Sequence, residues 1–154
     1  MKFVDLIKPS AIKVINTASS KKRLLHDVAD LAMAAYGIDA DTAVEALMER
    51  ESLGPTGVGH GVALPHARIA GIDDVLGVFL LLEKPINFDS VDRQPVDVVF
   101  GLFAPEDAGV EHLKALALVS RTLREESVCA KLRANHDPAT LYTILTESHS
   151  VQAA

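Results

Sequence analysis

The residues best suited to chemistry are a histidine and the glycine-rich stretch that precedes it. Four of the chain's nine glycines lie within residues 54–61, and His66 follows them in a Pro65-His66 pair. A glycine-dense loop can turn several backbone N–H groups toward one point, because glycine adopts positive φ and carries no Cβ to hinder an approaching anion. We therefore predict a phosphate environment made by Gly57, Gly59 and Gly61.

His66 is the side chain that this stretch offers for chemistry. Pro65 has no N–H to donate, which favours an edge strand that presents His66 at the surface. A neutral imidazole is a competent nucleophile toward phosphorus, and the phosphoramidate that it forms keeps much of its transfer potential. The pattern alone leaves open a second interpretation, a capped or solvent-facing histidine without a chemical role.

Known nucleotide and hydrolase motifs do not fit this stretch. A dinucleotide fingerprint would need Gly or Ala where Val62 stands, and a P-loop would need Gly-Lys-Ser/Thr. The chain has no Gly-x-Ser-x-Gly, and its single cysteine, Cys129, falls in a predicted helix away from the loop. The sequence therefore favours neither nucleotide binding nor a serine or cysteine hydrolase.

Two predicted helices lead into the glycine stretch. Ser19 or Ser20 can cap a helix with one apolar stripe, and Gly37 closes it. A second helix is expected to begin near Asp41 or Thr42 and to end before Gly54. Arg50 falls in its last turn, where a cation suits the helix dipole and can reach over the loop that follows.

Two apolar segments predict the centre of a sheet. Residues 75–82 and 96–104 are apolar on both faces, which is typical of strands covered by helices on both sides. The Lys84-Pro85 pair should end the first of them. Residues 62–68 are expected to form one further strand, and residues 14–15 a short edge strand.

The remaining chain predicts three helices. The first follows a loop at residues 105–109 and places His112 in its first turn, where the helix dipole disfavours imidazolium and favours an anion. We therefore predict a neutral His112 beside a phosphate site. Ser127 should cap a short helix, and Asp137-Pro138 should begin the last one.

The length and the predicted strands and helices indicate one α/β domain over residues 1–154, with a mixed β-sheet flanked by helices on both faces. The chain is 49% hydrophobic and 23% charged, and its length suits one domain. A formal net charge of −6 argues against nucleic acid as a partner. The longest apolar run is too short to span a membrane, and the N-terminus lacks a signal-peptide pattern, so we expect a cytoplasmic protein without membrane insertion.

A family resemblance rests on several runs of this sequence. They are Arg50-Glu51-Ser52-Leu53-Gly54, Thr56-Gly57-Val58-Gly59, Gly61-Val62-Ala63-Leu64-Pro65-His66-Ala67-Arg68 and Val110-Glu111-His112-Leu113-Lys114-Ala115-Leu116-Ala117, with Ser19 to Leu25 near the start. Together they resemble the fructose/mannitol-type IIA proteins of the bacterial phosphotransferase system, and most of all the nitrogen-regulatory branch. The resemblance covers nearly the whole chain.

The resemblance implies a function and a set of residues. His66 would accept a phosphoryl group from an HPr-like phosphohistidine protein, and His112 and Arg50 would stabilise that group. The phosphorylation state would then regulate partner proteins, which the sequence does not identify. No cofactor and no metal are implied.

Three alternatives stay open. A sugar-specific IIA component would pass the phosphoryl group on to a IIB domain. An interaction module would bind partners through the face around His66 without being phosphorylated. A metal site would use His60, His66 and His112 as ligands, although their spacing is not a known zinc pattern.

Overall fold

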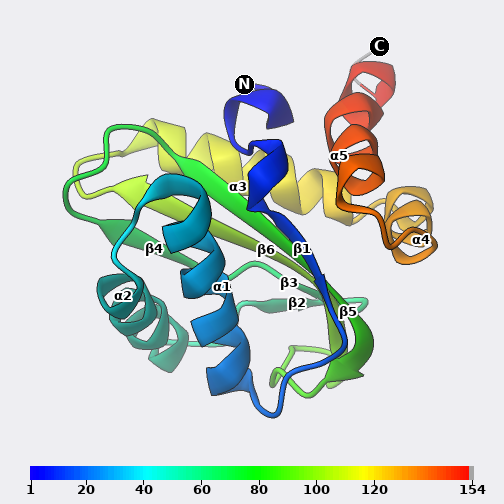
Figure 1. Cartoon of the computed structure of the whole chain (residues 1–154), viewed down its shortest axis with the longest axis horizontal. Coiled ribbons are helices and arrows are strands. Elements are labelled where there is room, and N and C mark those ends of the chain that lie inside the picture. The colour runs from blue at the N-terminus through cyan, green and yellow to red at the C-terminus, as the bar shows by residue number, and fades with distance from the viewer. Residues whose placement is uncertain (153–154) are drawn as a thin grey trace.

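The computed structural model describes the backbone of residues 1–152 and the side chains of residues 1–147 (Figure 1). Within that part of the chain, the strands form one six-stranded mixed sheet. Its two central strands, β5 (Leu76–Ile86) and β6 (Val96–Pro105), pair antiparallel. Residues 77–82 and 98–105 are buried throughout, which confirms the prediction of a two-sided apolar centre.

Short strands complete the sheet on either side. β1 (Ile12–Ile15) runs parallel to β5 and forms one edge, as predicted. On the other side, β3 (Val62–Ala63) and β4 (His66–Ile69) both run parallel to β6, and β2 (Gly57–Gly59) pairs antiparallel with β3.

The strand predicted over residues 62–68 is therefore two strands. The ladder with β6 is interrupted at Leu64 and Pro65, because proline has no N–H to donate to it. The Pro65 carbonyl still accepts a hydrogen bond from the Leu102 N–H at 3.0 Å. The interruption leaves the Leu64 carbonyl free to accept a bond from a side chain.

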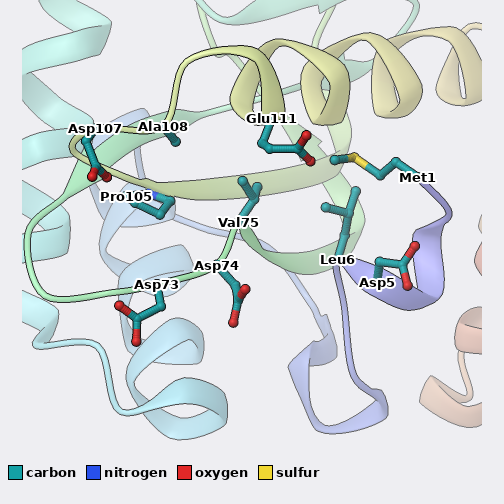
Figure 2. Close-up of a pocket in the computed structure, with 10 residues that line it drawn as sticks. All are labelled: Met1, Asp5, Leu6, Asp73, Asp74, Val75, Pro105, Asp107, Ala108 and Glu111. Atoms are coloured by element: carbon teal, nitrogen blue, oxygen red, sulfur yellow. The ribbon is translucent and has the colours of Figure 1, made fainter.

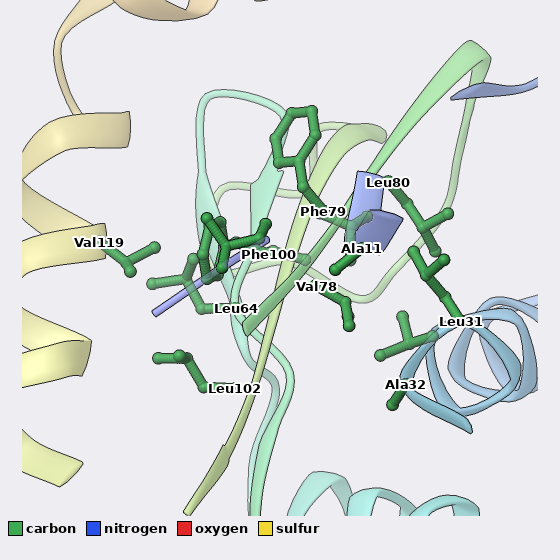
Figure 3. Packing of buried hydrophobic residues seen from close by; sticks show 14 of the residues in the cluster. Ala11, Leu31, Ala32, Leu64, Val78, Phe79, Leu80, Phe100, Leu102 and Val119 are labelled. Carbon is green, nitrogen blue, oxygen red and sulfur yellow. The ribbon is translucent and has the colours of Figure 1, made fainter. Parts of the chain in front are cut away.

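Helices cover both faces of the sheet. α1 (Lys21–Tyr36) and α2 (Ala40–Ser52) lie on one face, and α3 (Val110–Leu123) lies on the other. Figure 3 shows Leu31 and Ala32 of α1 on one side of the central strands and Val119 of α3 on the opposite side. Both faces of the sheet are therefore part of one hydrophobic core.

The N-terminal segment and the last two helices border the sheet. The 3-10 helices η1 (Phe3–Asp5) and η2 (Pro9–Ala11) precede β1. α4 (Glu126–Arg133) follows α3, and α5 (Pro138–Gln152) packs against β1 and η1. None of the described helices is both long and apolar enough to cross a membrane.

Helix ends follow the predicted caps with two exceptions. The Ser20 hydroxyl caps α1, Gly37 ends it at φ 74°, and the Asp137 side chain accepts a hydrogen bond from the Thr140 N–H. α2 begins earlier than predicted, because the Asp39 carboxylate caps it by accepting from the Thr42 N–H. α4 begins at Glu126, before the predicted cap Ser127, and has no side-chain cap.

One predicted strand end is also wrong. β5 continues through Lys84 and Pro85 to Ile86. Its pairing with β6 is irregular between Leu81 and Ile86, so no ladder bond from Pro85 is needed there.

Candidate active site

His66 lies at the start of β4 and lines an open pocket between α2, β4 and the first turn of α3. The empty space, including solvent at the mouth, is about 760 Å³. The lining residues come from three elements that are far apart in the sequence. They are Ala46, Glu49, Arg50, Leu53, His66, Ala67, Arg68 and His112. The fold thus brings the predicted residues His66, His112 and Arg50 into one place.

The backbone determines which nitrogen of His66 carries the proton. Its Nδ1 lies 2.8 Å from the Leu64 carbonyl oxygen. Because a carbonyl only accepts, Nδ1 must be the protonated nitrogen, and the lone pair of the neutral ring is then on Nε2. The sequence run Leu64-Pro65-His66 creates this contact, since Pro65 leaves the preceding carbonyl outside the strand ladder. Nε2 of His66 therefore carries the free lone pair of the ring.

Burial keeps the His66 ring neutral. Its pKa is lowered from the usual 6.5, chiefly by burial and in part by the Arg50 guanidinium. The hydrogen bond to Leu64 and the Glu51 carboxylate raise the pKa and oppose that effect. Because the lowering dominates, the neutral form of the imidazole is favoured near neutral pH.

His112 is the second histidine of the pocket. Its ring centroid lies 5.6 Å from that of His66, and the residue is 6% exposed. Burial lowers its pKa, as do the neighbouring His66 and Arg68. Its Nδ1 is buried and has no hydrogen-bond partner among the described residues, so Nε2 is the nitrogen available to the pocket. These findings agree with the predicted neutral His112.

Two arginines border the pocket. Arg50, in the last turn of α2, donates from Nη1 to the Gly54 carbonyl at 3.0 Å. Arg68, on β4, donates from Nη1 to the carbonyls of Glu106 and Ala108 in the loop before α3. Both side chains therefore have fixed positions, and both offer further N–H groups to an anion.

Arg68 is a candidate that the sequence prediction missed. It stands two residues after His66 on the same strand, so the two side chains project from the same face of β4. That period of two was a usable signal. It holds whether residues 62–68 form one strand or two, because His66 and Arg68 lie on the same side of Pro65.

The predicted glycines lie elsewhere. Gly57 and Gly59 belong to β2, Gly61 follows in the turn to β3, and none of the three lines the pocket of His66. Gly59 and Gly61 have φ of 103° and 80°, which a tight β2–β3 turn requires. A Cβ on Gly61 would lie 2.5 Å from Nη2 of Arg133 and 3.0 Å from Oδ1 of Asp97, so these side chains and the positive φ explain this glycine.

His60 also lies apart from His66 and His112. It occupies the β2–β3 turn at φ 56° and lines a different cavity with Ser120 and Arg124. Among the described residues, no group of three His, Cys, Asp or Glu side chains is placed to hold a metal ion. The proposed three-histidine ligand set is therefore wrong, because the turn directs its first member to another part of the surface.

A second pocket has the opposite charge. Figure 2 shows it beside the start of α3, with Val75, Pro105 and the N-terminal Met1 among its lining residues. Its charged side chains are the carboxylates of Asp5, Asp73, Asp74, Asp107 and Glu111. Such a lining repels a phosphoryl group, whereas the pocket of His66 contains two arginines.

Comparison with known proteins agrees with this geometry. Residues 5–148 match the family described as "Phosphoenolpyruvate-dependent sugar phosphotransferase system, EIIA 2". The nitrogen regulatory protein of Bradyrhizobium diazoefficiens is 43% identical over 145 residues, which are 94% of this chain and 95% of that protein. The nitrogen regulatory protein of Klebsiella oxytoca is 42% identical over 85% of this chain and 82% of its own length.

Solved structures show the same fold. The nitrogen regulatory protein IIA-Ntr of Neisseria meningitidis superposes with a TM-score of 0.86 at 33% identity, over 94% of this chain and 99% of that one. IIA mannitol of Escherichia coli superposes with a TM-score of 0.76 at 20% identity, over 90% and 97% of the two chains. The mixed sheet with helices on both faces is thus the IIA mannitol-type fold, as predicted. By sequence and by structure, the chain belongs to the EIIA 2 family of the phosphoenolpyruvate-dependent sugar phosphotransferase system.

Proposed function

We propose that this protein is a nitrogen-regulatory phosphocarrier that accepts a phosphoryl group on Nε2 of His66 from an HPr-like phosphohistidine protein. The observation that carries the proposal is the Nδ1–H bond from His66 to the Leu64 carbonyl, which leaves Nε2 as the nucleophile in a pocket with two arginines. Membership of the family and the nitrogen regulatory relatives support it. With such a donor, the reaction would take place in the cytoplasm.

The transfer needs no proton exchange with the protein. The Nε2 lone pair of His66 forms a bond to phosphorus, the P–N bond of the donor breaks, and its electron pair returns to the donor imidazole. His66 keeps its proton on Nδ1. The product ring carries more positive charge, which the Leu64 carbonyl stabilises as an acceptor 2.8 Å away. Because the bond broken and the bond formed are alike, the exchange is nearly balanced and reversible.

The surrounding side chains have separate parts in the proposal. Arg50 and Arg68 offer guanidinium N–H groups to the phosphoryl oxygens, and His112 offers Nε2–H from a neutral ring. The negative charge of the transferring group is then distributed over several N–H groups of this chain. These groups are in position before the phosphorylated HPr-like protein binds. Gly57, Gly59 and Gly61 hold the β2–β3 turn and take no direct part.

One experiment tests the acceptor. The protein is incubated with a phosphorylated HPr-type protein, and the phosphate on the chain is examined for stability in acid and base. We expect an acid-labile, base-stable phosphate that disappears in His66→Ala and persists in His136→Ala, which removes an exposed histidine. Absence of phosphate on the wild type would support a non-phosphorylated interaction module instead.

The phosphorylation state would regulate partner proteins. A pull-down that compares the wild type, His66→Ala and His66→Asp tests this part of the proposal. We expect at least one partner to distinguish His66→Ala from His66→Asp. The mimic is imperfect, because a carboxylate carries less charge than a phosphoryl group.

A sugar-specific role is the second candidate. The fructose-specific EIIA component of Haloferax volcanii is 33% identical to this chain over 84% of each protein. Incubation of the phosphorylated protein with a purified fructose-type or mannitol-type IIB domain separates the two roles. A nitrogen-regulatory protein keeps its phosphoryl group in that assay, whereas a sugar-specific component transfers it rapidly.

A further inference from the structure

A buried carboxylate lies at the junction of α2 and the glycine stretch. The Glu51 side chain is 7% exposed and lies 2.8 Å from the Lys21 ammonium. It also accepts two hydrogen bonds from Thr56, from N–H at 2.8 Å and from the Oγ1 hydroxyl at 2.5 Å. A buried charge is tolerated when it is paired and hydrogen-bonded in this way. The three groups that contact the Glu51 carboxylate are the Lys21 ammonium, the Thr56 N–H and the Thr56 hydroxyl.

Thr56 connects this carboxylate to the strand that precedes His66. Its carbonyl accepts a hydrogen bond from the Leu64 N–H at 2.9 Å. The Leu64 carbonyl in turn accepts the bond from Nδ1 of His66 at 2.8 Å. A continuous chain of short contacts therefore runs from Lys21 on α1, through Glu51 and Thr56, to the imidazole.

The next residue prevents Thr56 from moving away from Leu64. A Cβ on Gly57 would lie 2.2 Å from the Ser90 hydroxyl oxygen and 2.9 Å from Ser90 Cα, so the backbone is tightly packed there. The Gly57 carbonyl also accepts from the Val91 N–H. Thr56 is thus held by Glu51 on one side and by the loop at residues 87–95 on the other.

We propose that Glu51 is a positioning residue for His66, acting through Thr56 and the Leu64 carbonyl to hold the ring as the Nδ1–H tautomer with Nε2 directed into the pocket. The inference rests on the proposed function, since it names the group that prepares the acceptor. Glu51 does not line the pocket and does not touch the transferring group. Besides its charge, which raises the pKa of His66, Glu51 acts in this proposal by holding a carbonyl in place.

A loss of this restraint has a defined chemical consequence. If the Leu64 carbonyl moves, Nδ1–H loses its acceptor, and the neutral ring gains access to the tautomer with the proton on Nε2. That tautomer has no lone pair toward the pocket and does not accept a phosphoryl group. The rate of transfer then falls with the share of the Nδ1–H form, while docking of the donor protein is unchanged.

The test measures the tautomer directly in the unphosphorylated protein. The ring nitrogens of His66 are observed by long-range proton–nitrogen NMR above pH 7, in the wild type and in four variants. Thr56→Val removes the hydroxyl at nearly constant volume, Thr56→Ser keeps it, and Glu51→Gln removes the charge. Glu45→Gln removes the same charge from an exposed position of the same helix and is the control. Phosphotransfer from a phosphorylated HPr-type protein is measured on each.

We expect Thr56→Val and Glu51→Gln to lower the Nδ1–H share of His66 and to reduce kcat by about tenfold, with the KM for the donor within about twofold of wild type. Thr56→Ser and Glu45→Gln should resemble the wild type in both measurements. A folded Thr56→Val protein with the wild-type tautomer would overturn the proposal, whatever its rate.

Two further outcomes are also decisive. If Glu51→Gln does not fold, the pair Thr56→Val and Thr56→Ser alone decides, because both keep the buried charge pair. If the wild type accepts no phosphate, the proposed function fails, yet the tautomer measurement still confirms or overturns the role of Glu51.

Discussion

At the scale of single residues, burial favours the neutral form of both His66 and His112. The two rings differ in the hydrogen-bond partner of Nδ1. Burial lowers the pKa of both rings. His66 donates from Nδ1 to the backbone and has Nε2 free, whereas the buried Nδ1 of His112 has no partner among the described residues. The first arrangement suits a nucleophile, and the second leaves Nε2 as the group through which His112 can act.

Removal of the His112 ring should slow transfer without unfolding the protein. His112→Ala deletes the proposed hydrogen-bond donor to the transferring group, and loss of such a donor lowers rates by about a hundredfold to a thousandfold. The measurement is single-turnover phosphorylation by a phosphorylated HPr-type protein, with circular dichroism as the check on folding. His136→Ala is the matched control. An unchanged rate in folded His112→Ala would remove its proposed role.

Acid should destabilise the protein in part through these rings. The unfolded imidazole has a pKa of about 6.5, and the folded pKa is lower, so the unfolded chain binds protons first as the pH falls. The stabilisation is complete above the unfolded pKa and is lost as the pH falls through the folded pKa. The unfolding free energy is measured with urea at about pH 7.5 and at about pH 5.5. From the higher to the lower pH, His112→Gln should lose less unfolding free energy than the wild type loses. Equal losses would contradict the expected contribution of His112.

At the scale of elements, the β2–β3 hairpin holds the segment that leads to His66. The Arg133 guanidinium donates to both carboxylate oxygens of Asp97 and to the His60 carbonyl at the turn. The Asp92 carboxylate accepts from the His60 N–H. These contacts compensate for the positive φ of His60, a conformation that is costly for a residue with a Cβ.

Substitution of Gly61 tests how tightly this turn is packed. Gly71 has a similar φ, 85° against 80°, but a Cβ there would meet nothing within 4 Å. Gly71→Ala should therefore cost only backbone strain, about 1–2 kcal/mol of unfolding free energy. Gly61→Ala should cost clearly more, because its Cβ would meet Arg133 and Asp97. Urea unfolding of both variants measures the difference, and equal costs would show that Arg133 moves aside freely.

The sequence predicted elements well where the signal was local. The serine cap of α1, Gly37, the Asp137-Pro138 start and the two apolar strands depend on short patterns, and all are found. Strand β2 was missed although its partner β3 is close in the sequence, because three residues, Gly57–Gly59, are too few to show an apolar alternation. The split at Pro65 was missed because β3 and β4 are defined by their separate pairing with β6, which is distant in the sequence. Three of the candidate site residues, His66, His112 and Arg50, were found because they carry the family resemblance. The contacts of Arg68 with the loop before α3, and of Glu51 with Lys21 and Thr56, are created by the fold.

At the scale of the whole molecule, the pocket depends on a core shared by both faces of the sheet. Phe100 is fully buried on β6, and its ring lies 5.5 Å from that of Phe3 and 6.4 Å from that of Phe79. The side chains around it come from the N-terminal segment and from both central strands (Figure 3). We therefore expect residues 1–154 to unfold as one domain.

Truncation of Phe100 tests this expectation. Phe100→Ala should lower the unfolding free energy by about 3–5 kcal/mol, through lost burial and the cavity that remains. Urea unfolding is followed by far-ultraviolet circular dichroism and by tyrosine fluorescence, since Tyr36 and Tyr142 lie on α1 and α5. Both signals should shift together in wild type and variant. Two separate transitions would indicate that part of the chain folds independently.

The measurement that tests the central claim most directly is the location of the phosphoryl group. The protein is phosphorylated by an HPr-type protein, and phosphorus and nitrogen NMR of the histidine rings identify the modified nitrogen. We predict a phosphoramidate on Nε2 of His66, with the proton still on Nδ1. A phosphoryl group on Nδ1 of His66, on His112 or on His60 would contradict the account.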